Sequence, residues 1–434
     1  MKRKASPSSF SGDPPPAASP TTVDSFCDDV IAEFLVRLPS VPSLARAACA
    51  VKRWRRVASS PAFLRRFHAL HPGQAQPLLG HYYYTECSSR PVFQPAQPTF
   101  SDPELSAVVR HGDFFLTPVT SMGRLEVEDC HQGRLLLRNC DTNELTVFDP
   151  VARRVLAKLT PPRHGNKRAF HHNSGSFLIP GRVGDQAASS SSFRVVTMQR
   201  CSTTVIYASG GDQRLDMERL AVYDSSTGAW SARPWTNTGD IDMPLPLKVK
   251  RYSAMHAPGR ICWKRLRGGS PNSLVSLDAE TMGFPEVVPP PGVLLGPSYA
   301  VGDTDDGSMC LVNMEERGTM RLVMLSKKKW HLRVWLLGKS GCGGRAWVLD
   351  QEQETSLTTS TEDAADMLWD YDQACRVVAV NAGVVLMCLH SPRRLNDRYI
   401  AFRLSNLEVV ASFSASEPVF QYQMPWPPVL LPTA

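Results

Sequence analysis

Reactive side chains come first, because their spacing would reveal catalytic or metal chemistry. The sequence has no GxSxG turn, no phosphate-binding P-loop, no HExxH motif and no GxGxxG loop opening a helix. The best metal-like cluster is His171 and His172 with His164, in a basic loop without nearby carboxylates or thiols, which favours exposed loop histidines. The run Tyr82–Tyr84 is typical of strand packing. We therefore predict no catalytic residue, no cofactor and no metal site, and a protein that is not an enzyme.

Cysteine usage indicates a reducing compartment. The eleven cysteines are an odd number without a CxxC pair, and no N-x-S/T sequon occurs. The N-terminal residues have no apolar region of a secretory signal, and no apolar run reaches the length of about 18 residues that a membrane helix needs. We expect a protein of the cytoplasm, the nucleus or both, without membrane contact.

The positive charge is concentrated near one end of the chain. The net charge is +7, yet outside the segment from Phe34 to His71 the sequence has 40 basic and 41 acidic residues. That segment contains no Asp or Glu, and such a basic module suits an acidic protein, a nucleic acid or a membrane surface. Its eight basic residues are Arg37, Arg46, Lys52, Arg53, Arg55, Arg56, Arg65 and Arg66.

Residues 24–70 have the periodicity of three short amphipathic helices. We expect the first helix to be capped by Asp24 or Ser25 and to end before Pro39, the second to begin at Ser43, and the third to follow the cap Ser60. About 45 residues make a marginal core, so a partner or neighbour should cover the apolar faces. These faces consist of Val30, Ile31, Phe34, Leu35 and Leu38, then Leu44, Ala47, Ala48, Val51 and Trp54, then Phe63, Leu64, Phe67 and Leu70.

From residue 77 onward the pattern changes to short strands separated by turns. A glycine opens an apolar strand at Gly133, Gly259, Gly307 and Gly383. A later strand of the repeat ends in an Asp that suits an Asx-type turn, as at Asp149, Asp224 and Asp278, or in Ser326 or Ser405. The aromatic residues after three of these turns, Trp230, Phe284 and Trp330, should pack between adjacent sheets.

This repeat predicts a β-propeller-like domain. At about 40–50 residues per blade, residues 77–425 give about seven blades, within a range of six to eight. The segment from Leu78 to Tyr84 is expected to close the ring with a C-terminal strand near 407–413. The predicted organisation is a disordered Pro/Ser-rich tail (1–22), the helical module (23–71), the β-domain (77–425) and an extended tail (426–434).

The helical module resembles an F-box, in particular the version common in grass proteins. The motifs are Asp28-Asp29, Leu38-Pro39, the run 44–47 (Leu-Ala-Arg-Ala), the run 53–55 (Arg-Trp-Arg), and Ser60-Pro61 with Phe63. One departure is Phe26-Cys27, where many F-boxes have Leu-Pro. The β-rich part is similar, more loosely, to the F-box-associated domain of the same plant proteins. The fold class expected is α+β and multidomain, with a three-helix F-box followed by a mainly-β, propeller-like domain.

The resemblance implies a substrate-recognition subunit of an SCF-type ubiquitin ligase. An F-box binds the small acidic Skp-type adaptor, which joins it to a cullin, while the second domain holds a target protein of unknown identity. Helix-in-groove docking and opposite charge agree with this role. The adaptor-binding residues that it implies are Phe26, Val30, Ile31, Phe34, Leu38, Pro39, Leu44, Val51 and Trp54.

Two alternatives stay open. A propeller scaffold that docks proteins without any ligase would have the same sequence features, because ligase chemistry lies in other subunits. A nucleic-acid binder would need base-reading side chains on the exposed helix faces, whereas the aromatic residues lie on the apolar face, so no nucleic-acid partner is expected.

Overall fold

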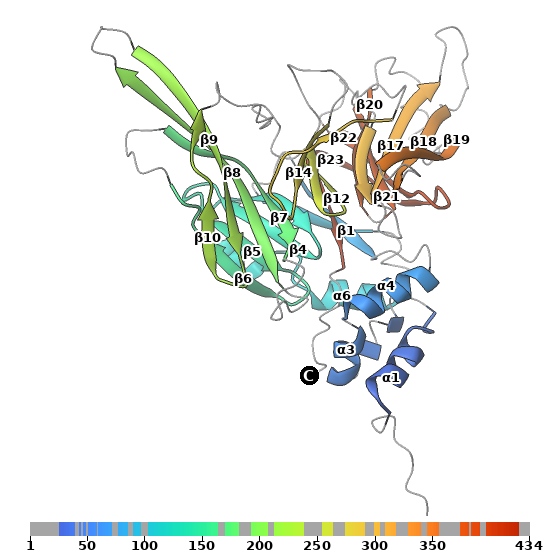
Figure 1. Cartoon of the computed structure of the whole chain (residues 1–434). Coiled ribbons are helices and arrows are strands. Elements are labelled where there is room, and N and C mark those ends of the chain that lie inside the picture. The colour runs from blue at the N-terminus through green and yellow to red at the C-terminus, as the bar shows by residue number, and fades with distance from the viewer. Residues whose placement is uncertain are drawn as a thin grey trace, which may run out of the picture.

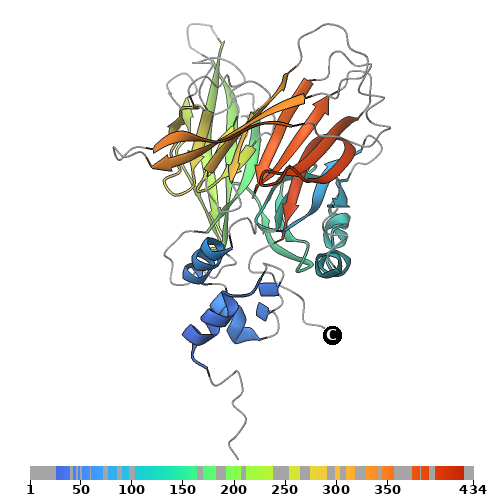
Figure 2. The ribbon, with the colours of Figure 1, turned by 90° about the vertical axis from the view of Figure 1, so that its right-hand side faces the viewer.

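The computed structural model describes a mainly-β protein with helices concentrated near its N-terminus (Figures 1 and 2). The predicted tails at 1–22 and 426–434 lie outside the described residues. In the described part, no helix is long and apolar enough to span a bilayer. The description covers residues 26–39, 43–44, 47–48, 51–58, 60–71, 77–85, 90–96, 103–163, 170–181, 192–206, 212–237, 254–263, 274–290, 299–303, 309–317, 329–339, 345–355, 374–381, 383–390 and 396–424.

The helical module contains α1 (Asp28–Leu35), α3 (Lys52–Ala58) and α4 (Pro61–Leu70). Helix α4 begins as predicted, because the Ser60 hydroxyl accepts a hydrogen bond from the Phe63 N–H at 3.2 Å. Two predicted boundaries were wrong. The N-cap of α1 is Cys27 rather than Asp24 or Ser25. The single helix predicted from Ser43 through Trp54 is interrupted at Val51.

The interruption at Val51 lies directly before α3. Residues 43–44 and 47–48 are helical, but Val51 is not, and its carbonyl accepts the Arg55 N–H at 3.1 Å at the start of α3. The apolar spacing could not reveal the break, because apolar residues on both sides of it pack into the same cluster.

The β-strands form antiparallel meanders of four or more strands. The first runs through β3 (Leu125–His131), β4 (Arg134–Asn139), β5 (Leu145–Asp149) and β6 (Arg154–Leu159). The second runs through β7 (Phe170–Pro180), β8 (Phe193–Ile206), β9 (Asp212–Asp224) and β10 (Ala229–Ala232), and β11 (Thr236–Asn237) also pairs with β9. The third contains β12 (Ala254–Ala257), β13 (Arg260–Trp263), β14 (Leu274–Asp278) and β15 (Glu286–Val287).

A ten-stranded sheet contains the remaining strands. One part consists of β16 (Tyr299–Asp303), β17 (Met309–Arg317), β18 (Lys329–Lys339) and β19 (Arg345–Thr355). The other part consists of β20 (Ala374–Asn381), β21 (Val384–His390), β22 (Asp397–Arg403), β23 (Val409–Gln423), β1 (Leu78–Tyr84) and β2 (Val92–Pro95). The two parts meet at one parallel contact, Gly302 opposite Val380. A short helix, α6 (Pro103–His111), lies between β2 and β3 in the chain.

The turns confirm the predicted glycine and aspartate roles. Gly133, Gly259 and Gly383 have φ of 72°, 69° and 70°, and each directly precedes the second strand of its meander. A residue with a Cβ adopts this left-handed region at a cost, which explains the glycine. The Asp149, Asp224 and Asp278 carboxylates each accept backbone N–H groups two or three residues later, at 2.9–3.1 Å. The glycine expected at 307 and the Ser326 turn lie outside the described residues.

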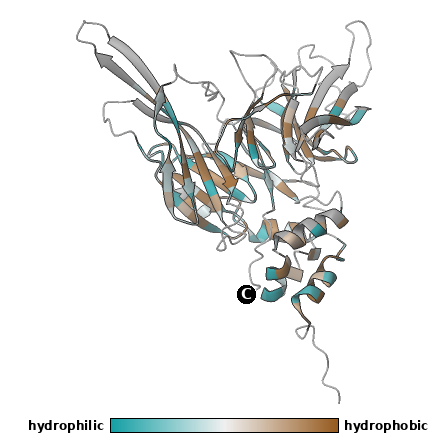
Figure 3. Cartoon of the chain, in the orientation of Figure 1, coloured by the Kyte–Doolittle hydropathy of each residue, from teal (hydrophilic) through white to brown (hydrophobic). Residues whose placement is uncertain are grey.

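Hydrophobic clusters lie between successive sheets. Figure 3 marks hydrophobic residues along the strands in brown. One cluster joins the first and second meanders, the next joins the second and third, and a larger one joins the third to both parts of the long sheet. Trp230 and Phe284 pack against two of these clusters, as predicted for the aromatic residues after the turns. The side chain of Trp330 lies outside the described part. In the described part of the chain, the cluster of the helical module draws its members from residues 26–67.

Strand β23 belongs to two sheet segments and closes the ring. Its first half pairs with β22 up to Ala415, and its second half pairs with β1 from Ser416 to Gln423. The ring-closing role of Leu78–Tyr84 is thus confirmed, but the partner residues are 416–423 rather than 407–413. The two ends of the β-rich part, which we call the β body (residues 77–424), lie side by side. The Met424 N–H donates to the Pro77 carbonyl at 2.9 Å.

Six strands follow one another around a common centre in the described part. They are β3, β7, β12, β16, β20 and the second half of β23, joined in that order by hydrogen bonds, a bridge or packed clusters. The arrangement is therefore propeller-like. The six strands found in the described part correspond to the lower end of the predicted range of six to eight blades.

Candidate functional site

The residues expected to bind an adaptor separate into buried and exposed groups. Ile31 and Leu44 are 2% and 0% exposed, so they belong to the core of the helical module. Phe26, Leu38 and Trp54 are partly buried and pack against that core, and Val30 and Val51 are half-buried. Phe34 is 58% exposed and Pro39 is also exposed. The docking function can therefore rest on part of the predicted set only.

Phe34 lies within an apolar surface at the start of the module. Its ring centroid is 6.0 Å from that of Phe26, which precedes α1. Leu70, at the end of α4, is 57% exposed and is a second large apolar side chain on the module surface. The indole Nε1 of Trp54 is buried, and no hydrogen-bond partner for it is found in the described residues. A buried indole N–H without a partner is destabilising. The Trp54 N–H is therefore a hydrogen-bond donor that the module on its own does not use.

The basic residues of the module are neutralised more than the sequence indicated. The Asp28 carboxylate accepts hydrogen bonds from Arg53 at 2.7 Å and from Arg56 at 2.9 Å. Glu33 pairs with Arg66 at 2.5 Å and with Arg37 at 3.9 Å. These arginine hydrogen bonds lower the pKa of both carboxyl groups. Four of the eight basic residues of the acid-free segment are therefore paired, because the two acids of α1 lie just outside that segment.

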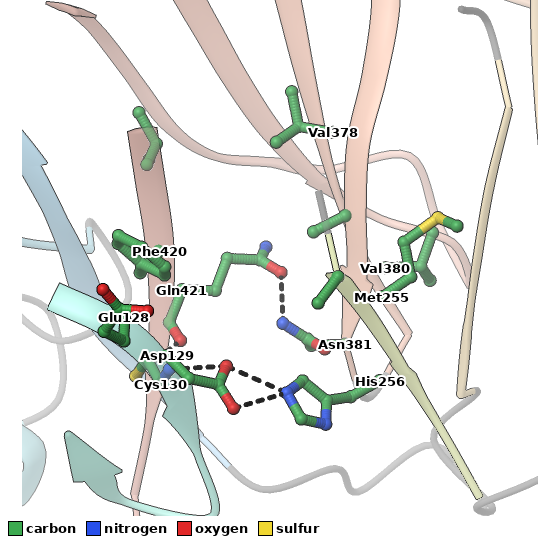
Figure 4. A pocket seen from close by; sticks show the side chains of 13 residues that line it. Glu128, Asp129, Cys130, Met255, His256, Val378, Val380, Asn381, Phe420 and Gln421 are labelled. Atoms are coloured by element: carbon green, nitrogen blue, oxygen red, sulfur yellow. Dashed lines mark hydrogen bonds and ion pairs between the residues drawn. The ribbon is translucent and has the colours of Figure 1, made fainter. Parts of the chain in front are cut away.

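A second polar site, which the sequence reasoning missed, lies at the centre of the β body (Figure 4). The Asp129 carboxylate accepts the Leu178 N–H at 2.7 Å, the Cys130 N–H at 2.8 Å and the His256 Nε2–H at 2.9 Å. It thereby joins β3 to β7 and to β12. The neighbouring carboxylate of Glu128 accepts the Ser176 N–H at 3.2 Å and also pairs with Arg138.

A second wall of this site comes from β20 and β23. The Asn381 amide donates to the Gln421 side-chain oxygen at 2.9 Å, and the Cys130 thiol donates to the Gln421 backbone carbonyl at 3.2 Å. The cavity between the two walls measures about 40 Å³, which is room for a few water molecules at most. Figure 4 shows the Asp129–His256 pair and the Asn381–Gln421 pair on adjoining sides of it.

The chemistry of the centre is suited to holding strands together. Burial raises the pKa of the Cys130 thiol well above its ordinary value, so it is not a thiolate nucleophile at neutral pH. The His131 ring stacks on His256 with centroids 4.0 Å apart, and burial, His256 and Arg134 together hold the pKa of His131 well below its usual value. A usable signal was present in the sequence: LEVEDCH breaks strand alternation with adjacent polar residues directly before a glycine-opened strand.

The expectation of loop histidines was wrong for two of the three residues, because His171 and His172 lie in strand β7. Their side chains lie outside the described part of the chain, as does His164. Within the part of the chain that the structure describes, no group of three or more His, Cys, Asp or Glu is placed to hold a metal ion.

Comparison with known proteins identifies no family. No protein-family model and no curated protein matches the chain. Solved structures that share an arrangement with it include dipeptidyl peptidase 4 of Porphyromonas gingivalis, at 7% identity and a TM-score of 0.26 over 68% of this chain and 40% of that one. The chain thus spans less than half the length of that peptidase.

Two further structures are equally distant. A duf4221 family member from Bacteroides vulgatus has 12% identity and a TM-score of 0.30, covering 65% of this chain and 78% of that one. The Nup133 β-propeller domain of Vanderwaltozyma polyspora has 8% identity and a TM-score of 0.22, covering 69% and 85%. Likenesses this weak carry no functional argument, and the description of the ring rests on its own strand pairing.

Proposed function

We propose that the chain is the substrate-recognition subunit of an SCF-type ubiquitin ligase. In this proposal the helical module binds a Skp-type adaptor and through it a cullin, and the β body binds the target protein. The observation that carries the proposal is a small helical module with its own core and large apolar side chains on its surface, Phe34 at 58% and Leu70 at 57% exposure. The F-box motifs of residues 28–63 supply the identity of the partner.

The energetics of the module favour a docking role. A helical unit of this size buries little apolar area on its own, so covering Phe34 and the partly buried Leu38 and Trp54 by a partner is favourable. Burial of a Phe side chain contributes about 1.5–3 kcal/mol. Ligase chemistry belongs to other subunits, so the proposal assigns this chain no catalytic residue and no cofactor. It places the protein in the cytoplasm or nucleus, where such ligases act.

Co-purification with the adaptor tests the proposal. The full chain is expressed with a Skp-type adaptor and a cullin, and recovery of both is measured. Phe34→Asp and Leu38→Asp should each reduce recovery strongly, since an unpaired carboxylate buried at an interface costs several kcal/mol, on the order of the whole interaction. Trp54→Ala should also reduce recovery, because it removes apolar area that packs against the module core. Val348→Asp is the matched control, because Val348 is 60% exposed on β19 in the β body.

Two outcomes would contradict the proposal. The first is a wild-type chain that recovers neither adaptor nor cullin while remaining folded by circular dichroism. The second is recovery that is equal for wild type, Phe34→Asp and Leu38→Asp. If the β body still captures a protein in either case, the non-ligase scaffold becomes the better description.

A further inference from the structure

Phe115 is the most exposed large apolar side chain in the described part of the chain, at 85%. The residues on either side are anchored: Phe114 and Leu116 are 3% and 4% exposed and belong to the cluster around β1 and the first meander. Leu116 has φ of 59°, a left-handed conformation that a bulky residue adopts rarely. The Thr117 hydroxyl donates to the Asp113 carboxylate at 3.0 Å. The loop is therefore fixed in a strained conformation that displays Phe115, and such strain concentrates at binding sites.

Basic residues lie beside this loop. The Asp113 N–H donates to the Pro150 carbonyl at 2.8 Å, which fastens the loop to the turn between β5 and β6. That turn leads into Arg153 and Arg154, which are both exposed, as is Lys158 farther along β6. The sequence from 150 to 184 contains no Asp or Glu and seven basic residues: Arg153, Arg154, Lys158, Arg163, Lys167, Arg168 and Arg182.

Strand β6 is the outermost strand of the first meander. It pairs with β5 on one side, and no other described strand pairs with its second edge. The register sets Arg154 opposite Asp149 and Lys158 opposite Thr146, with an irregularity between them. Because Asp149 and Thr146 lie on opposite faces of β5, Arg154 and Lys158 lie on opposite faces of the edge strand.

We propose that Phe115 and the free edge of β6, with Arg153, Arg154 and Lys158, form a docking surface for an extended acidic segment of a partner protein that also carries an apolar side chain. The segment would pair with the backbone of β6, place acidic side chains beside the basic ones, and cover the Phe115 ring. The inference rests on the proposed function, since it specifies the class of target that the β body holds.

Two features favour this occupant over others. A free strand edge offers backbone N–H and C=O groups in the spacing of a polypeptide, which a nucleic acid cannot match. A second copy of β6 would bring like charges to the same edge, so the charges that attract an acidic segment also keep copies apart. Asp149 is buried and lies close to both Arg134 and Arg154, so it offsets part of the charge of Arg154. Arg153 and Lys158, which are both exposed, carry the rest of the positive charge at this edge.

Selection from a random peptide display library with the folded full chain as bait tests the proposal. Enriched peptides should be rich in Asp and Glu and contain an aliphatic or aromatic residue. A labelled enriched peptide should bind at least about tenfold more weakly to Phe115→Ser and to Arg153→Glu/Arg154→Glu than to wild type, and more weakly as salt rises. Arg233→Glu, which changes an exposed arginine at the end of the second meander, is the matched control and should bind as wild type does.

Several results would overturn the proposal. One is a selection whose enriched peptides are not rich in Asp and Glu. Another is equal binding of the labelled peptide by wild type and both surface variants, with thermal unfolding of the variants unchanged. Tighter binding of an oligothymidylate that the same variants abolish would reassign the surface to nucleic acid. Adaptor recovery is measured with the same variants and should be unchanged, so a failure of this surface is distinguishable from a failure of the adaptor proposal.

Discussion

His81 provides the most direct quantitative test of the β body. It lies in the ring-closing strand β1, opposite Gln94 of β2 and Gln421 of β23, and its side chain is fully buried. No hydrogen-bond partner for either ring nitrogen is found in the described residues, and the ring lies 4.9 Å from that of Phe413. Burial lowers the pKa of His81 from 6.5 to about 3. The His81 ring is therefore neutral in the folded protein.

The sign of the pH dependence follows from this shift. Between pH 6.5 and pH 3 the unfolded chain binds a proton at His81 that the folded chain does not, so stability falls as the pH falls. At about 1.36 kcal/mol per pH unit, the free energy of unfolding should be about 2 kcal/mol lower at pH 5 than at pH 7 on account of this group. In the His81→Leu variant this pH-dependent change in the free energy of unfolding should be absent. It should also be about 1–3 kcal/mol more stable at pH 7, because the unpaired nitrogens are removed.

Urea unfolding followed by tryptophan fluorescence, at pH 7 and pH 5, measures both effects. The difference between the two pH values should be about 2 kcal/mol larger for wild type than for His81→Leu. His111→Leu, at an exposed histidine at the end of α6, is the control and should behave as wild type does. Equal losses for wild type and His81→Leu would refute the reasoning, since His81 would then have a proton-accepting environment in the folded state.

Three further predictions concern packing, domain independence and charge. Gly302→Val should lower the free energy of unfolding by about 2–4 kcal/mol, because a Cβ at Gly302 would lie 2.0 Å from the Val380 carbonyl oxygen; thermal unfolding measures the loss. A fragment that begins at Gln76 should melt cooperatively with a β-type circular dichroism spectrum, since the helical module has its own cluster, and a fragment that begins after Tyr84 should not, since it lacks the ring-closing strand. Asp28→Asn should unmask two arginines, so the adaptor on-rate in stopped flow should rise and depend more steeply on salt than in wild type; an unchanged salt dependence would show that the pairing does not control steering.

Local patterns in the sequence were sufficient to predict the turns. A positive φ requires glycine, and an Asx turn requires a side-chain acceptor, so Gly133 or Asp278 is informative without any tertiary knowledge. Helical periodicity located the module but did not show which apolar residues face outward. Ile31 and Phe34 occupy the same apolar stripe, yet one is buried and the other exposed.

Contacts between distant residues could not be predicted in this way. Asp129 and His256 are 127 positions apart, and no local pattern connects them. The pairing of Asp28 with Arg53 across the module was missed for the same reason, since charge was counted along the chain rather than between helices. The division of β23 between two sheet segments depends on the geometry of the whole ring, which determines where the strand changes partner.

The shared strand β23 has a consequence for the order of folding. Strand β1 is made early, yet its partner residues 416–423 come some 340 positions later in the chain. Until those residues arrive, one edge of β1 and the apolar cluster around Tyr82 have no cover from Tyr422. Pairing over such a separation carries a large loop-closure entropy and is slow. We therefore expect the helical module to fold first and the ring to close in a late, single step, and chains truncated before residue 416 to expose apolar surface that chaperones and proteases recognise.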